Sequence, residues 1–173
     1  DFGNVISTVV DNPDISDNNQ SQRVGQSTKP ANAEVWGGSY LELDDPIDFS
    51  SLVNLGVNVW SPQSGIIVKL KVENATNPDI FYGSDLVINS ANAWEELNFD
   101  FSGADLTQEY HQIVIFFDFG NSGTDTTYYF DDIKLVQSDS EVFESFEDFE
   151  GAAPIFTEFG NIGSTQVISN PNP

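Results

Sequence analysis

The chain has 173 residues, enough for one compact domain with a sizeable core, and a formal net charge of −23 from 28 acidic and 5 basic residues. This balance makes nucleic acid and anionic membranes poor partners, because binding phosphate needs clustered Lys and Arg. There is no cysteine, which excludes disulfides and zinc–thiolate sites, and no apolar stretch reaches the length of a membrane span.

Short alternating runs rich in aromatic and β-branched residues, bounded by Gly, Pro, Asn and Asp, predict an all-β protein, either a sandwich or a barrel. No helix of normal length is expected. In chain order, the predicted strands are residues 4–10, 22–28, 34–43, 52–60, 65–73, 81–88, 94–102, 111–119 and 127–136.

Alternation assigns faces to these strands. The polar faces carry Asn58 and Trp60 in the strand 52–60, and Lys69 and Lys71 in the strand 65–73. If these two strands form a hairpin, the lysines lie near Trp60.

The end of the chain repeats its beginning. Residues 159–167 follow residues 2–10 nearly in step, and each run is followed by an Asn-Pro pair. The separation is about one domain length, which predicts a module followed by the opening of a second one. The predicted organisation is a module at 1–136, a linker at 137–142, and at 143–173 either the opening strands of a second module or a segment that completes the first.

Several motifs resemble a jelly-roll module that recurs in secreted multidomain proteins of polysaccharide-degrading bacteria. They are Trp36-Gly37-Gly38, Asp48-Phe49-Ser50, Val59-Trp60-Ser61-Pro62, the run 91–97, Asp100-Phe101-Ser102 and Phe130-Asp131-Asp132-Ile133. The resemblance covers roughly 2–135 and restarts near 146. It implies an antiparallel β-sandwich (jelly roll) similar to carbohydrate-binding modules.

In that family a strand like Phe146-Glu147-Asp148 precedes the Phe-Gly-Asn motif, and the first module here lacks it. We therefore expect residues 143–150 to supply the missing edge strand, in the same molecule or in a neighbour, because an unfilled edge exposes unpaired backbone groups. If a neighbour is used, head-to-tail self-association through 143–150 follows.

Sugar recognition uses aromatic rings that cover the C–H faces of pyranoses, with polar groups beside them for the hydroxyls. The candidate carbohydrate-binding residues are Trp60, Asn58, Lys69, Lys71, Trp36 and Tyr40. Trp60 ranks first because it shares a polar face with Asn58. The alternative for the lysines is that they neutralise nearby carboxylates or lie over aromatic surface. For Trp60 and Trp36 the alternative is packing, and Trp94 is interpreted as a packing tryptophan.

The resemblance also implies a structural Ca²⁺ between the first and last strands, with Asp131 and Asp132 joined by Glu147 or Asp148. The alternative is that these are ordinary solvated acids. The loop 11–17 lacks the central glycine of an EF-hand and is interpreted as a polar turn.

Catalysis is weakly supported, because the single histidine, His111, has no evident Ser or Cys partner. The favoured function is a non-catalytic carbohydrate-binding module of a secreted or cell-surface protein, which binds a neutral β-glucan or an anionic glycan. The alternative is a structural repeat of a surface adhesin or filament, assembled through 143–173.

Overall fold

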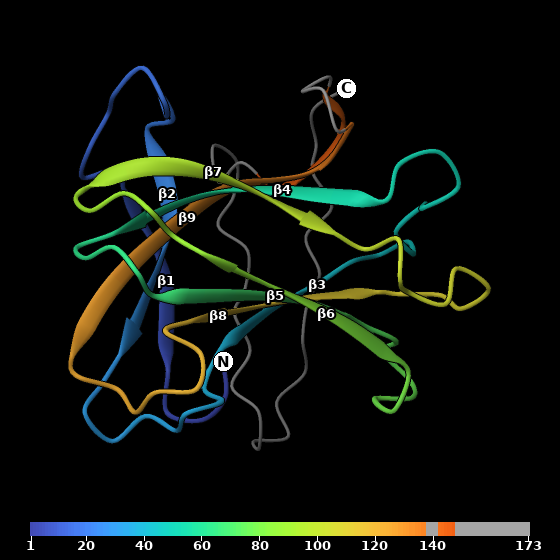
Figure 1. The fold of residues 1–173 in the computed structure, drawn as a ribbon, viewed down its shortest axis with the longest axis horizontal. Helices are drawn as coiled ribbons and strands as arrows, with labels where there is room; N and C mark the ends of the chain where they lie inside the picture. Colours follow the sequence, from blue (N-terminus) through green and yellow to red (C-terminus); the bar gives the residue numbers. More distant parts are fainter. Residues whose placement is uncertain (138–141, 148–173) are drawn as a thin grey trace.

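The computed structural model of the chain describes residues 1–137 and 142–147. Within them lie ten strands and no helix, so no described segment is a long apolar helix of the kind that crosses a membrane. The strands form two antiparallel sheets that pack face to face as a β-sandwich. Figure 1 shows the two layers, with β4 and β7 above β5 and β6.

The larger sheet has the order β1–β2–β9–β4–β7, and the smaller one has the order β3–β8–β5–β6. The strands of the large sheet are β1 (Ile6–Asp11), β2 (Arg23–Lys29), β9 (Thr126–Val136), β4 (Asn54–Ser61) and β7 (Ala93–Asp100). Those of the small sheet are β3 (Ser39–Glu42), β8 (Gln112–Phe117), β5 (Ile67–Glu73) and β6 (Phe81–Val87). A tenth strand, β10 (Val142–Glu147), also joins the large sheet.

The core lies between the sheets and follows from the alternation. In β5, Val68, Leu70 and Val72 are fully buried, whereas the residues between them are half-buried. Each buried Val or Leu stabilises the fold by about 1.5–3 kcal/mol relative to an exposed one. Each of the nine strands predicted up to residue 136 is present, with shifts of a few residues at the ends.

The hairpin considered for the strands 52–60 and 65–73 does not form, so the lysines do not lie near Trp60. Strand β4 pairs with β7 and β9, and β5 pairs with β6 and β8, so the two strands lie in different sheets. Two strands with one apolar face each can bury those faces only against another layer. The connection 62–66 crosses between the sheets and brings the two apolar faces together in one core.

The predicted strand 34–43 begins only at Ser39. The residues before it form a turn against the N-terminal segment, where the Gly37 N–H donates to the Glu34 carbonyl (2.9 Å) and the Glu34 N–H donates to the Gly3 carbonyl (2.9 Å). A side chain at Gly38 would lie 2.7 Å from the Ile115 carbonyl oxygen. Gly38 therefore lies close against the backbone of β8, the neighbouring strand of the same sheet.

Strand β10 pairs with β9 in the same chain, from Val142 opposite Val136 to Glu147 opposite Ile133, with two irregularities in register. It lies on the side of β9 that also holds β2, because β4 occupies the other side. An edge strand within 143–150 was predicted, and the described part of it pairs inside the molecule. Residues 148–150 lie outside the described residues, and self-association remains a prediction.

Candidate functional site

The six candidate carbohydrate-binding residues are divided between opposite outer faces of the sandwich. The inward residues of β4 and β5 meet in one core, so the alternate residues of each strand point away from it. Asn58 and Trp60 lie on the outer face of the large sheet. Lys69, Lys71 and Tyr40 lie on the outer face of the small sheet, which we call the small-sheet face.

A row of aromatic rings borders the small-sheet face. Phe116 of β8 contacts Phe2 edge to face (centroids 5.6 Å apart) and Phe119 in the same way (5.3 Å). Trp36 lies parallel to Phe2, with centroids 6.1 Å apart and an interplanar angle of 14°. The Trp36 side chain is 51% exposed. It is thus held by one ring face and open to solvent elsewhere, although it lies in a turn and not on a strand.

Both lysines of the small-sheet face have acidic and aromatic partners. Lys69 Nζ lies 2.7 Å from Asp85 Oδ1 on β6 and 4.7 Å from the centre of the Phe119 ring. Lys71 forms an ion pair with Glu73, and its Nζ lies 4.2 Å from the centre of the Phe81 ring. The alternative interpretation, that these lysines neutralise carboxylates and lie over aromatic surface, is confirmed.

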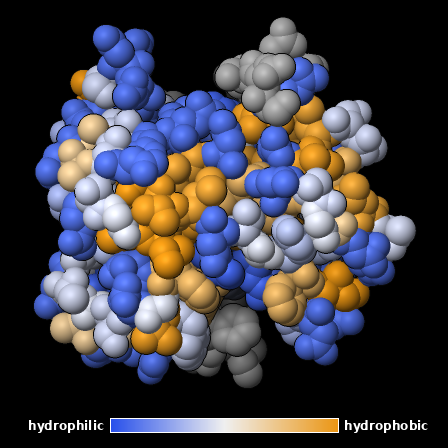
Figure 2. Space-filling view, in the orientation of Figure 1, coloured by the Kyte–Doolittle hydropathy of each residue, from blue (hydrophilic) through white to orange (hydrophobic). Residues whose placement is uncertain are grey.

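Hydrophobic side chains also reach the surface beside this face. Figure 2 shows them in the middle of the view, between hydrophilic side chains. On the edge strand β6, Phe81 is 55% exposed and Val87 is 48% exposed. The small-sheet face and its edge therefore combine exposed aromatic and aliphatic surface with ion pairs.

The tryptophans of the large sheet are packed. Trp94 is 2% exposed, and its indole N–H donates to the Asp14 carbonyl (2.8 Å), which confirms its packing role. Trp60 lies opposite Trp94 in the β4–β7 register and meets Tyr129 edge to face (5.4 Å). Trp60 is half-buried, and its Nε1 is buried without a hydrogen-bond partner among the described residues. Asn58 is 7% exposed. By exposure, Trp36 ranks above Trp60.

Two of the four predicted calcium ligands meet at a bulge in β9, where Asp132 has φ 52°. Asp131 is fully buried; its Oδ2 accepts from Asn19 Nδ2 (2.8 Å), and its Oδ1 is buried without a partner among the described residues. Burial raises the pKa of Asp131 to about 7. Asp132 Oδ2 accepts from Asn58 Nδ2 (3.0 Å).

The chemistry of Asp131 and Asp132 fits a hard cation that prefers oxygen ligands, because one oxygen of Asp131 is buried without a partner among the described residues. The side-chain amides of Asn19 and Asn58, which donate to these carboxylates, each carry an oxygen as well. No group of three carboxylate or imidazole side chains gathers within the described residues. Glu147 lies next to the bulge in the β10–β9 register, but its side chain and Asp148 are outside the described residues.

Two kinds of site residue were missed by sequence reasoning. Phe2 and Phe119 hold the aromatic row, and Asn19 reaches Asp131 from the polar loop 12–22. Period-2 alternation does not mark any of them, because they lie outside the regular strands. The only available signal for Asn19 was a run of amide residues in a loop with no apolar pattern.

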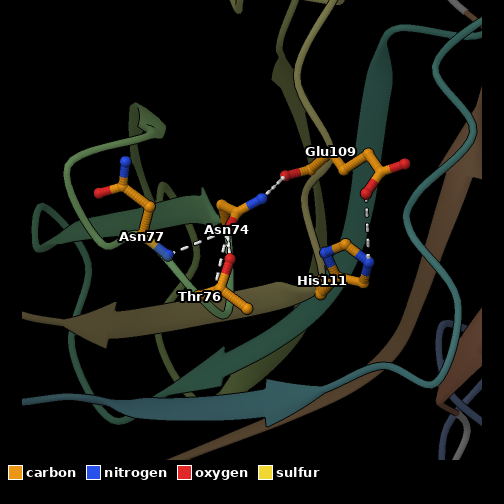
Figure 3. Close-up of polar contacts among 5 residues, drawn as sticks. All are labelled: Asn74, Thr76, Asn77, Glu109 and His111. Carbon is orange, nitrogen blue, oxygen red and sulfur yellow. Dashed lines mark hydrogen bonds and ion pairs between the residues drawn. The ribbon is translucent and has the colours of Figure 1, made fainter.

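His111 lies in a network that closes a turn (Figure 3). Its Nε2 is 4.0 Å from Glu109 Oε2. Asn74 Nδ2 donates to the Glu109 carbonyl (2.9 Å), while Asn74 Oδ1 accepts from the N–H groups of Thr76 and Asn77 (3.0 Å each). These contacts fasten the β5–β6 turn to the segment that enters β8. The arrangement supports the interpretation of His111 as a structural residue.

No protein-family model matches the sequence, and no curated protein matches it. Among solved structures, the chain is similar to a family 11 carbohydrate-binding module from Clostridium thermocellum, which was solved in complex with a β-1,3-1,4-mixed-linked tetrasaccharide. The TM-score is 0.51 at 12% sequence identity, and the match covers 75% of this chain and 80% of that one. It is equally similar to the family 11 module of the cellulosomal cellulase Lic26A-Cel5E from the same organism (TM-score 0.51, 12% identity, 78% and 82% coverage). A family 30 module from that organism has a TM-score of 0.47 at 13% identity, over 69% of this chain and 77% of that one. The chain therefore has the antiparallel β-sandwich fold of the two family 11 modules.

Proposed function

We propose that this chain is a non-catalytic polysaccharide-binding module and that its binding surface is the small-sheet face. The observation that carries the proposal is Trp36, whose ring is half exposed and lies parallel on Phe2. An indole held in a fixed orientation offers its exposed surface to the C–H face of a pyranose with little loss of side-chain entropy.

Polar groups lie farther along the same face. A series of aromatic contacts, through Phe119, Phe116 and Phe2, leads from Lys69 to Trp36. Tyr40 lies opposite Val114 on the same face. These groups supply donors and acceptors for sugar hydroxyls. An open face with spaced aromatic and polar groups suits a chain of sugars.

The fold supports the same class of function, since one family 11 module of this fold was solved with a β-glucan tetrasaccharide. A fold alone does not establish a ligand, so the argument depends on the residues of the small-sheet face. By the same analogy with a module of a cellulosomal cellulase, we propose that the protein is secreted or held at a cell surface.

We also propose a structural Ca²⁺ at the β9 bulge. Asp131 and Asp132 would hold it, with amide oxygens of Asn19 and Asn58 as further ligands. When bound, the ion supplies positive charge to a buried carboxylate that otherwise has one unpartnered oxygen.

The test is isothermal titration with soluble polysaccharides, namely mixed-linkage β-glucan, laminarin, alginate and a carrageenan. We expect saturable binding to at least one of them. Trp36→Ala should weaken that binding about 10-fold or more, because it removes the contact area of the ring together with a stacking contribution of about 0.5–1.5 kcal/mol.

Trp60→Phe is the matched control, because it changes an aromatic residue on the opposite outer face. It should leave the affinity within about 2-fold of the original. Near-ultraviolet circular dichroism will show whether both variants keep their packing. Binding that survives Trp36→Ala in a folded protein, or no binding to any of the four polysaccharides, would contradict the proposal.

A further inference from the structure

We infer that the glycan bound by the small-sheet face is uncharged. This inference rests on the proposed function and decides between the neutral and anionic ligands that the sequence left open. The observation that carries it is that the chain has few basic residues and that each of them already has a hydrogen-bond or ion-pair partner.

All five basic side chains of the chain lie within residues 1–137, and each one has an acceptor. Away from the small-sheet face, Lys29 is 2% exposed and donates to the carbonyls of Phe117 (3.1 Å) and Asp118 (2.9 Å). Arg23 donates to the Val9 carbonyl (3.2 Å), and Lys134 Nζ lies 3.4 Å from Glu96 Oε1. None of these three can serve a ligand on the small-sheet face.

On the small-sheet face, both lysines are paired with carboxylates. Their side chains are about one-fifth exposed, at 21% for Lys69 and 20% for Lys71, and the partner Glu73 is only 18% exposed. An anionic glycan that reached these lysines would lie beside the carboxylates of Glu73 on β5 and Asp85 on β6, which stay next to the ammonium groups. These carboxylates would repel its negative charges.

The charge of the whole chain acts in the same direction. A net charge of −23 repels polyanions over about a Debye length, roughly 8–10 Å at physiological ionic strength. No unpaired cation on the small-sheet face offsets that repulsion.

The same ion pairs suit a neutral sugar. A lysine ammonium has three N–H groups and a carboxylate has several lone pairs, so each pair keeps donors and acceptors after its internal bond is made. Adjacent sugar hydroxyls both donate and accept. The rings of Phe119 and Phe81 lie against the two ammonium groups, and within each ion pair the two charges cancel.

The experiment measures affinity for mixed-linkage β-glucan, laminarin, alginate and carrageenan at 50 and 500 mM NaCl, using the full chain. We expect binding to a neutral glucan that changes less than about 2-fold with salt. Binding to alginate and carrageenan should be at least about 30-fold weaker at both salt concentrations.

The double substitution Glu73→Gln and Asp85→Asn frees both lysines. It should create alginate binding that is about 10-fold stronger at 50 than at 500 mM NaCl. The matched control is Asp48→Asn with Asp100→Asn, which removes two charges from carboxylates that accept from Ser50 and Ser102 and frees no lysine. This control should bind alginate no better than the original chain.

The outcomes separate the inference from the proposed function. Salt-sensitive binding of alginate or carrageenan by the unmodified chain, lost in Lys69→Ala, would overturn the inference and leave the polysaccharide-binding function standing. A freed-lysine variant that binds alginate no better than its control would also overturn it. Failure to bind all four polysaccharides would overturn both.

Discussion

The side-chain amide of Asn19 donates a hydrogen bond to the carboxylate of Asp131, 112 residues later in the chain (2.8 Å). The contact joins the loop between β1 and β2 to the bulge of β9. Trp94 anchors the same loop from the other end, through its bond to the Asp14 carbonyl. The polar turn predicted at 11–17 is thus part of a cover over the outer face of the large sheet, and Asp131 is buried beneath it.

The calcium proposal predicts opposite effects of Asp131→Asn with and without the ion. With about 1 mM Ca²⁺ the original chain should gain thermal stability and the variant should not. In chelator the variant should be as stable or more stable, by about 1–3 kcal/mol, because it keeps the shape and removes a buried charge. Thermal unfolding of both proteins in both buffers measures this. Equal responses to Ca²⁺ would argue against a site at Asp131.

Asn19→Ala should lower the free energy of unfolding by about 1–3 kcal/mol, because it removes a hydrogen-bond donor from the buried carboxylate of Asp131. Asn121→Ala is the control, since Asn121 Nδ2 makes the same kind of bond to Asp118 (2.8 Å) at the exposed surface. There the loss should be below about 0.5 kcal/mol, because water replaces the donor. Urea unfolding followed by fluorescence gives both values, and similar losses would mean that the cover over Asp131 adds no stability.

Gly38→Ala should destabilise the fold by about 1–3 kcal/mol and weaken glycan binding. The added methyl group would lie 2.7 Å from the Ile115 carbonyl oxygen and 2.8 Å from the Phe116 ring, which supports Phe2 and Trp36. Gly83→Ala on the same sheet is the control for stability only, because its nearest contact is the flexible end of Lys69 at 3.1 Å. Comparison of urea midpoints and glucan affinities tests this, and an unaffected Gly38→Ala protein would contradict it.

Because the hydroxyl of Tyr128 is buried, we expect the free energy of unfolding to fall in alkaline solution. Burial raises the pKa of its hydroxyl from 10.0 to about 12, so between these values the unfolded chain loses this proton and the folded chain keeps it. Stability should therefore be unaffected by this group below pH 10 and should fall by up to about 3 kcal/mol as pH rises to 12. Urea unfolding at pH 9, 10 and 11 should show a smaller decline for Tyr128→Phe than for the original chain; equal declines would contradict the assignment.

The strands could be predicted from the sequence because their information is local. The alternation in β5 identifies the inward Val68, Leu70 and Val72 and the outward lysines without knowledge of any partner. The sheet that each strand joins could not be predicted in this way. Pairing of β4 with β9 joins residues about 75 apart in the chain, as in the bond from Asn58 to Asp132, and no local pattern records such a partner.

The same limit explains why the roles of the candidate site residues could not be predicted from the sequence. The sequence selects aromatic and basic residues as candidates, but their neighbours in the fold decide how each one is placed. Trp60 and Trp36 have the same side chain, and only the packing around each shows that one is half-buried against Tyr129 and the other is exposed on Phe2. The partners of Lys69 include Asp85, which is placed beside it by the pairing of β5 with β6.

The placement of β10 has a consequence for how the chain continues. Because Glu147 lies opposite Ile133 and not beyond the end of β9, the backbone turns back along the large sheet before the repeated segment begins. The described end of β10 is therefore set by pairing with β9, close to the Asp131–Asp132 bulge. A domain attached at the end of β10 would start from a position that the large sheet fixes. A cation bound at the bulge would stabilise that position further.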